Sequence, residues 1–199
     1  GVEGKAIDLN CIWGDGVKLL VNGKVVGEPL TMPFSLSYIR GDGLFETILG
    51  IDEKIIAWQR HYERLAKSAE KVLITIPAKI DIEIGINQLL KGVIGKSRIR
   101  VAVLADGTWL VAVEAAESFD KLPSLIKMNQ VINSNSPLSG IKSISYGQSM
   151  LAVRTAHARG YSDGVYLNEN GEMWSTKKNG NNKKNRRCCN YRRCRNPIS

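Results

Sequence analysis

The chain has 199 residues, of which 43% are hydrophobic and 24% charged, the composition of an ordinary soluble globular protein. This length suffices for one large or two small domains. No apolar run is long enough to span a bilayer, and the first residues lack a signal-peptide pattern, so we expect a cytoplasmic protein without membrane contact.

The net charge of +9 resides in the last segment of the chain. Residues 177–199 hold nine Lys or Arg and no Asp or Glu. Subtracting those nine from the 28 basic residues leaves 19, which balances the 19 acidic residues, so the rest of the chain is neutral and does not favour nucleic-acid binding. Outside this segment the chain has one cysteine, Cys11, which predicts a reducing compartment.

Residues 1–18 are weakly patterned and predict a poorly ordered lead-in. The pair Asn22-Gly23 lies between two apolar runs and predicts a β-hairpin, because both residues accept the positive φ angles of a tight turn. Residues 44–51 alternate like a strand, and residues 54–58 are expected to return as its partner.

Apolar residues at three- and four-residue steps predict a helix over residues 59–73. Residues 80–93 fit both a strand-like alternation and helical steps, and their length favours a helix. Two strands between residues 98 and 114 are joined at Asp106-Gly107, a second hairpin turn. Together these elements predict an α+β domain over residues 19–114 with a largely antiparallel sheet.

The polar segment 115–123 ends in proline and predicts a linker to a second domain at residues 124–176. In that domain we expect a strand at 125–131, a helix at 148–159 and two strands joined by a tight turn at Asn170-Gly171. This alternation is typical of an α/β domain.

Lys142 lies in an otherwise neutral segment, between a run of turn-forming residues and the start of a helix. Such a lysine is usually a solvated surface charge. Held among apolar neighbours, a lysine can instead act as an amine nucleophile. Spacing alone does not decide between the two interpretations.

The residues around Lys142 form a longer series, with IKS at 141–143, MLA at 150–152 and AHARG at 156–160. This series resembles the cofactor-lysine region of the class IV, fold-type IV pyridoxal-phosphate enzymes, which are the branched-chain and D-amino-acid aminotransferases and 4-amino-4-deoxychorismate lyase. RGDGLFET at 40–47 and HYERL at 61–65 resemble two further signatures of that family, in the expected order.

The resemblance covers about residues 19–176 and implies a two-domain fold-type IV architecture. An N-terminal α+β domain would be followed by an incomplete, barrel-like C-terminal α/β domain. It also implies pyridoxal 5′-phosphate as cofactor, a small amino compound as substrate, and a homodimer if the second domain is complete.

On the same resemblance Lys142 is the catalytic, Schiff-base lysine, which also moves the proton at the substrate Cα. Arg64 would bind the cofactor phosphate, and Tyr146 would lie near the ring hydroxyl. From the residues alone, Arg64 can equally be a surface residue whose stem covers the core, and Tyr146 a half-buried aromatic at a helix start. We predict no metal site, since His61 and His157 are far apart in sequence.

The choice among family members rests on two segments that disagree. RGDGLFETI at 40–48 and residues 142–146 are closer to the lyase, which releases pyruvate and leaves p-aminobenzoate for folate synthesis. Residues 68–77 are similar to the D-amino-acid aminotransferases. We favour the lyase, and a D-amino-acid or branched-chain aminotransferase remains the alternative.

Beyond Thr176 the resemblance ends, and Ser175 stands where the family has a glutamate. Runs of Lys and Asn, then Arg and Cys, suggest translation in a wrong reading frame after about Ser175, while a basic tail that binds nucleic acid is the other interpretation. We therefore expect the chain as written to be inactive or nearly so, with an inactive remnant as a further alternative.

Overall fold

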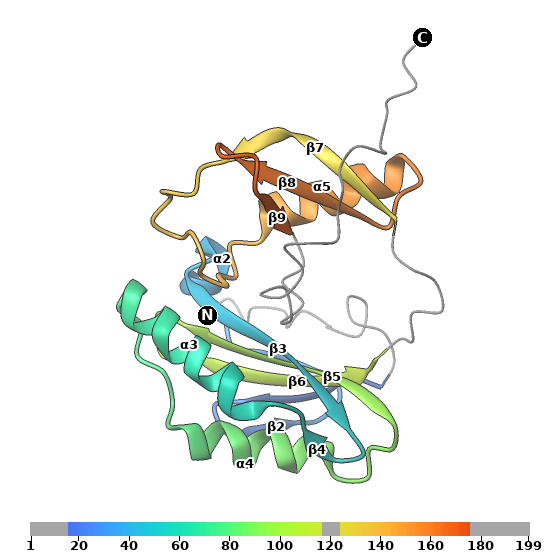
Figure 1. Cartoon of the computed structure of the whole chain (residues 1–199). Coiled ribbons are helices and arrows are strands. Elements are labelled where there is room, and N and C mark those ends of the chain that lie inside the picture. The colour runs from blue at the N-terminus through green and yellow to red at the C-terminus, as the bar shows by residue number, and fades with distance from the viewer. Residues whose placement is uncertain (1–15, 117–123, 176–199) are drawn as a thin grey trace, which may run out of the picture. The chain divides into compact units, whose positions relative to one another are not determined.

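The computed structural model describes residues 16–116 and 124–175 (Figure 1). Most of the predicted lead-in and linker, and all of the basic segment 177–199, lie outside the described residues. The described residues form two compact units, each treated by itself below. Residues 16–116 and 135–146 belong to the first unit, and residues 124–134 and 147–175 to the second.

The first unit contains a six-stranded sheet with the strand order β2-β1-β6-β5-β3-β4. Every neighbouring pair of its strands is antiparallel, which confirms the predicted antiparallel α+β arrangement. The strands are β1 (Lys18–Val21), β2 (Lys24–Val26), β3 (Gly43–Ile51), β4 (Lys54–Ile55), β5 (Lys96–Leu104) and β6 (Trp109–Ala115).

Tight turns join three pairs of these strands, as the sequence predicts. Asn22 and Gly23, between β1 and β2, have φ angles of 48° and 79°, the left-handed values that an Asn-Gly turn accepts. Gly107 has a φ angle of 87° between β5 and β6. The turn between β3 and β4 places Asp52 and Glu53 at positive φ, and β4 is shorter than the predicted return strand.

Three helices accompany this sheet: α2 (Leu36–Arg40), α3 (Trp58–Val72) and α4 (Lys79–Leu90). The helix α3 confirms the predicted one, and α4 settles the ambiguous segment in favour of a helix. The sequence analysis did not predict the short α2. Its first turn is capped by the Ser35 side chain, which accepts a hydrogen bond from the amide of Tyr38, and Gly41 ends it at a φ angle of 69°.

The main core of the first unit lies between the sheet and the helices α3 and α4, which share one face of the sheet (Figure 1). Alternation along β3 sends Leu44, Glu46 and Ile48 into this core. A smaller apolar cluster on other sheet positions contains Leu19 and Leu110.

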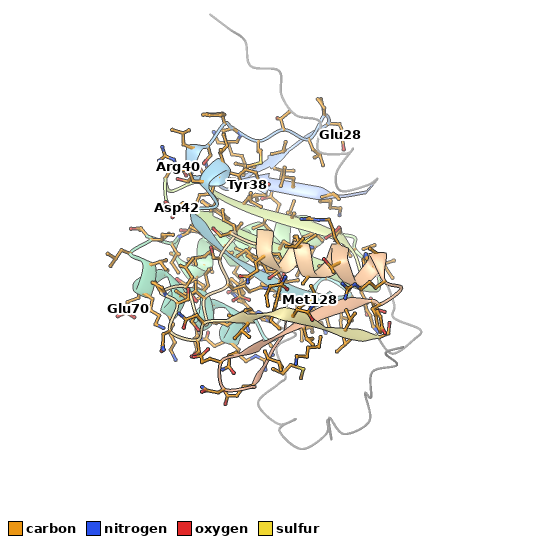
Figure 2. The ribbon with its side chains drawn as sticks, turned by 90° about the horizontal axis from the view of Figure 1, so that it is seen from above. Glu28, Tyr38, Arg40, Asp42, Glu70 and Met128 are labelled. Atoms are coloured by element: carbon orange, nitrogen blue, oxygen red, sulfur yellow. The ribbon has the colours of Figure 1, made fainter. Side chains whose placement is uncertain are left out.

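The second unit has a three-stranded sheet in the order β7-β8-β9, with α5 packed against it. Its elements are β7 (Leu125–Ile132), α5 (Gly147–Ala158), β8 (Asp163–Asn168) and β9 (Met173–Ser175). The strands β7 and β8 are parallel, and α5 connects them, whereas β8 and β9 form the predicted hairpin. Met128 of β7, labelled in Figure 2, packs with Ala152 and Tyr166 in the core of this unit.

The fold class is mixed α/β, as predicted, and none of the helices in the described residues is long and apolar enough to cross a membrane. One assignment differs from the sequence analysis. Residues 135–146, placed there in the second domain, belong to the first unit. The reason is that this segment pairs with β3.

Candidate active site

The segment that carries Lys142 is hydrogen-bonded to the start of β3. The Phe45 amide donates to the Lys142 carbonyl at 2.9 Å, and the Ile144 amide donates to the Gly43 carbonyl at 3.0 Å. Leu44 and Ser143 form an antiparallel bridge between these two bonds. Since β5 pairs with the other edge of β3, the lysine segment occupies the edge that β4 takes further along the strand.

The Gly-Asp-Gly turn before β3 makes this close approach possible. A Cβ atom at Gly41 would lie 2.6 Å from Ser145 Oγ, and that hydroxyl donates to the Gly41 carbonyl at 2.7 Å. A Cβ atom at Gly43 would lie 2.7 Å from the Val103 carbonyl oxygen and 3.0 Å from Ile144 Cδ1. Both positions therefore require glycine, because a side chain would collide with the lysine segment or with β5. Figure 2 shows Arg40 and Asp42 on either side of Gly41.

Two of the predicted site residues meet at the ring of Phe45. Lys142 Nζ lies 4.0 Å from the centroid of this ring, and the ring of Tyr146 contacts it edge-to-face with centroids 5.3 Å apart. Both Lys142 and Tyr146 are half-buried. The structure thus brings together an amine, a phenol and an aromatic surface.

A pocket of about 370 Å³ opens beside this ring. Phe45 and Tyr146 line it together with Tyr38 and Arg100, and its remaining walls are apolar. Arg100 is the only charged side chain among the lining residues, all of which belong to the described part of the first unit. This volume lies within the usual range for small-molecule sites, about 300–1,000 Å³, and the few polar groups could orient a ligand.

Arg64, the third predicted site residue, lies apart from this pocket. Its Nε atom donates to Glu46 Oε1 at 2.7 Å, and its Nη2 atom makes a second, very short contact with Glu46 Oε2. His61 Nδ1 lies 2.9 Å from the same Oε2 atom. Because neighbouring side chains of a strand point to opposite faces, Arg64 beside Glu46 lies across β3 from Lys142 beside Phe45.

The carboxylate of Glu46 is the electrostatic centre of this cluster. Burial by itself raises the pKa of Glu46, but hydrogen bonds from Arg64 and His61, aided by their charges, outweigh burial and leave the pKa below its usual value. The same hydrogen bond raises the pKa of the Arg64 guanidinium. Glu46 is therefore ionised at neutral pH although only 1% of its side chain is exposed.

Sequence analysis missed Glu46, His61 and Arg100 as site candidates, and a signal for the first two was present. Glu46 occupies a core-facing position of an alternating strand, where an ionised carboxylate requires cationic partners. The next helix presents His61 and Arg64 three residues apart, and therefore on one face. No comparable signal marked Arg100, because only the folded sheet places it in the pocket.

The sequence profile described as amino-transferase class IV matches residues 43–178, more than half of the chain. The chain belongs to the class IV aminotransferase family. This family uses pyridoxal phosphate, and a hypothetical aminotransferase from Mycobacterium tuberculosis, similar in structure to this class IV chain, is known in a pyridoxal-phosphate-bound form. Among curated proteins no match was found for this class IV chain.

Several solved structures share the fold of this class IV chain. A fold IV transaminase from Curtobacterium pusillum has 21% identity and a TM-score of 0.69 over 79% of this chain and 66% of its own. A candidate 4-amino-4-deoxychorismate lyase from Legionella pneumophila has 23% identity and a TM-score of 0.66 over 76% of this chain and 63% of its own.

A branched-chain amino acid aminotransferase from the source organism T.th., solved with pyridoxamine 5′-phosphate, has 22% identity and a TM-score of 0.67. It is matched over 78% of this chain and 60% of its own. This class IV chain thus spans somewhat less than two thirds of the length of the structures it matches.

Among the described residues of this class IV chain, no group of three or more His, Cys, Asp or Glu side chains comes together as a metal-binding cluster. The roles predicted for Lys142, Arg64 and Tyr146, a homodimer and a cytoplasmic location stay predictions.

Proposed function

We propose that the chain holds pyridoxal phosphate through Lys142, whose ε-amine condenses with the cofactor aldehyde and releases one water molecule. The observation that carries this proposal is the placement of the amine. Lys142 Nζ lies against the ring of Phe45, which lines the pocket, on a segment that two backbone hydrogen bonds fix to β3. A half-buried amine beside an aromatic ring is a suitable attachment point for a planar aldehyde.

The other predicted residues fit a phosphorylated aromatic cofactor in part. Tyr146 offers a hydroxyl group on the same ring surface as Lys142. Arg64 already donates to Glu46, but a guanidinium has five N–H groups and keeps donors for a phosphate. About a third of its side chain, 32%, is exposed, so the guanidinium is not enclosed by the core.

Arg100 supports an anionic group on the substrate. In the folded sheet Arg98 Nε lies 2.7 Å and Arg100 Nε 3.5 Å from the same atom, Glu114 Oε1. Two guanidinium groups therefore share one carboxylate, which leaves a net positive charge at the pocket wall. We propose that Arg100 attracts the carboxylate of a small amino substrate.

When bound, pyridoxal phosphate supplies an electron sink for the bond pair released next to the substrate amino group. The part we assign to the protein is proton movement. Lys142, free once the substrate amine has taken its place, removes the proton from the carbon that bears the amino group and delivers it elsewhere. The neighbouring Phe45 excludes water from one side of the amine.

We propose 4-amino-4-deoxychorismate as the substrate. In that reaction the C–O bond of the enolpyruvyl ether breaks, the ring becomes aromatic, and the products are pyruvate and p-aminobenzoate. The support is the similarity of RGDGLFETI and residues 142–146 to the lyase branch, two segments that are joined by hydrogen bonds in this fold. An aminotransferase, favoured by residues 68–77, is the second candidate.

The attachment site is tested by borohydride reduction of the chain with pyridoxal phosphate, followed by peptide mapping. We expect the reduced label on Lys142 and its disappearance in Lys142→Ala. Lys127, on β7 of the second unit, supplies the matched control, and Lys127→Ala should leave labelling unchanged. A label that persists in Lys142→Ala would overturn the assignment.

The reaction is tested by supplying the chain, together with pyridoxal phosphate, with 4-amino-4-deoxychorismate and, separately, with D- and L-amino acids plus a keto acid. The lyase proposal predicts pyruvate and p-aminobenzoate in equal amounts without added keto acid. Amino-group transfer with no pyruvate from 4-amino-4-deoxychorismate would instead identify an aminotransferase.

A further inference from the structure

The cluster of Glu46, His61 and Arg64 is built more completely than the predicted phosphate role of Arg64 requires. Glu46 lies in the core with both carboxylate oxygens engaged, Oε1 by Arg64 Nε and Oε2 by Arg64 Nη2 and His61 Nδ1. A bidentate contact between guanidinium and carboxylate fixes the plane of the guanidinium as well as its position.

The tautomer of His61 follows from its contact with Glu46. Nδ1 lies 2.9 Å from a carboxylate oxygen that is ionised at neutral pH and can only accept, so Nδ1 must carry the hydrogen and donate it. The 3.2 Å approach of Arg64 Nη2 to Nδ1 then sets two donors side by side and is no hydrogen bond. His61 is thus a second donor that holds the carboxylate of Glu46 toward Arg64.

This arrangement leaves one edge of Arg64 available. Its Nε–H and one Nη2–H point to Glu46, and no acceptor for Nη1 lies among the residues that the structure describes. The two N–H groups of Nη1 and the second of Nη2 thus remain as donors on the side away from Glu46.

We propose that Glu46, held by His61, is a positioning residue that fixes the guanidinium of Arg64 so that its Nη1 side binds the cofactor phosphate. This inference rests on the proposed function, since it requires that the chain binds pyridoxal phosphate. It adds a buried carboxylate and a histidine of defined tautomer to the predicted site.

Charge and position make opposite contributions to phosphate binding. The carboxylate of Glu46 partly cancels the charge of Arg64, so its removal strengthens the long-range attraction for phosphate. Its removal also frees a long side chain, which must then be ordered each time phosphate binds. Phosphate recognition by arginine depends on parallel, aligned N–H groups, and we therefore expect the loss of position to dominate.

The test compares two probes on the full chain, pyridoxal phosphate and pyridoxal, which has the same aldehyde but no phosphate. Dissociation constants are measured by absorbance titration. The ratio of the two constants isolates the phosphate contribution, and the pyridoxal constant alone reports whether Lys142 and the fold are intact. A general loss of folding would weaken both probes and leave the ratio unchanged.

Two substitutions separate position from charge. Glu46→Gln keeps the length and removes the charge, whereas Glu46→Asp keeps the charge and withdraws it by one methylene. We expect each to lower the preference for pyridoxal phosphate about tenfold, with the pyridoxal constant unchanged. Glu63→Gln on α3, an exposed carboxylate one residue before Arg64, is the matched control and should change neither constant.

The histidine is tested in the same way. His61→Phe removes the donor and should lower the preference, and His61→Asn, whose amide can replace Nδ1–H, should restore most of it. If Glu46→Gln raises the preference and Glu46→Asp leaves it unchanged, Glu46 only masks charge and the inference is wrong.

The proposed function and the inference fail in different ways. If Arg64→Ala lowers the preference and the Glu46 variants do not, Arg64 binds phosphate without positioning and only the inference fails. If Arg64→Ala leaves the preference unchanged, or the native chain shows none, the phosphate role of Arg64 fails and the inference falls with it.

Discussion

At the residue scale, Glu46 couples folding to pH. Its pKa lies below the usual value in the folded chain because Arg64 and His61 outweigh the effect of burial. In the unfolded chain a glutamate titrates near its ordinary pKa of about 4.3. The stabilisation is therefore fully present above that pH and is lost as the pH falls through the lower, folded-state pKa.

Glu46→Gln should remove this part of the pH dependence. At pH 7 we expect the substitution to lower the free energy of unfolding by about 2 kcal/mol, less than for a fully buried ion pair because Arg64 is partly exposed. Below about pH 3 the native carboxyl is protonated and the difference should shrink toward zero. Urea unfolding between pH 3 and pH 7 measures this, with Glu63→Gln as the exposed control. Parallel curves for the native chain and Glu46→Gln would contradict the assignment.

At the scale of elements, the start of β3 serves as a docking site for the lysine segment, and Gly43 is its most constrained position. Gly43→Ala places a methyl group 2.7 Å from the Val103 carbonyl oxygen, a backbone atom that cannot move aside without displacing β5. We expect a loss of about 1–3 kcal/mol in the free energy of unfolding and a reduced borohydride label on Lys142. Gly27→Ala meets nothing within 4 Å and should change neither measurement. An unchanged label in a folded Gly43→Ala chain would show that docking is not needed to place the amine.

The helix α4 gives a second prediction at this scale, because its isoleucines alternate along the sequence but not in exposure. In a strand Ile80 and Ile82 would share one face, whereas in α4 Ile82 is 0% exposed and Ile80 is 58% exposed. Ile82→Ala should therefore cost about 2–5 kcal/mol of unfolding free energy, and Ile80→Ala about 0.5 kcal/mol or less. Equal losses in urea unfolding would contradict the helix.

At the scale of the whole molecule, the chain passes from the second unit into the first and back to present Lys142. Residues 124–134 belong to the second unit, 135–146 to the first, and 147–175 to the second again. The lysine segment should therefore open together with the first unit, although both of its flanks belong to the other.

Hydrogen exchange tests this assignment. Ile82→Ala weakens the core of the first unit and should speed exchange at the amides of Phe45 and Ile144, which close the hydrogen bonds to the lysine segment. Met128→Ala weakens the core of the second unit and should leave those two amides unchanged while speeding exchange in β8. The opposite pattern would place the lysine segment with the second unit.

The sequence by itself determined the elements whose causes are local. The pair Asn22-Gly23 specifies its turn because each residue accepts a positive φ angle, and the apolar steps of α3 specify an amphipathic helix without reference to the rest of the chain. The motifs around Lys142 were also sufficient to identify the family, since they are short, ordered and separated by characteristic distances.

Only the tertiary structure decided which groups meet. Glu46, His61 and Arg64 converge because a strand and the following helix pack face to face, and Lys142 lies against Phe45 because its segment pairs with β3 about a hundred residues earlier in the chain. Such contacts depend on the summed packing of the core. Local propensity carries no information on them, because the residues involved are neighbours in space and not in sequence.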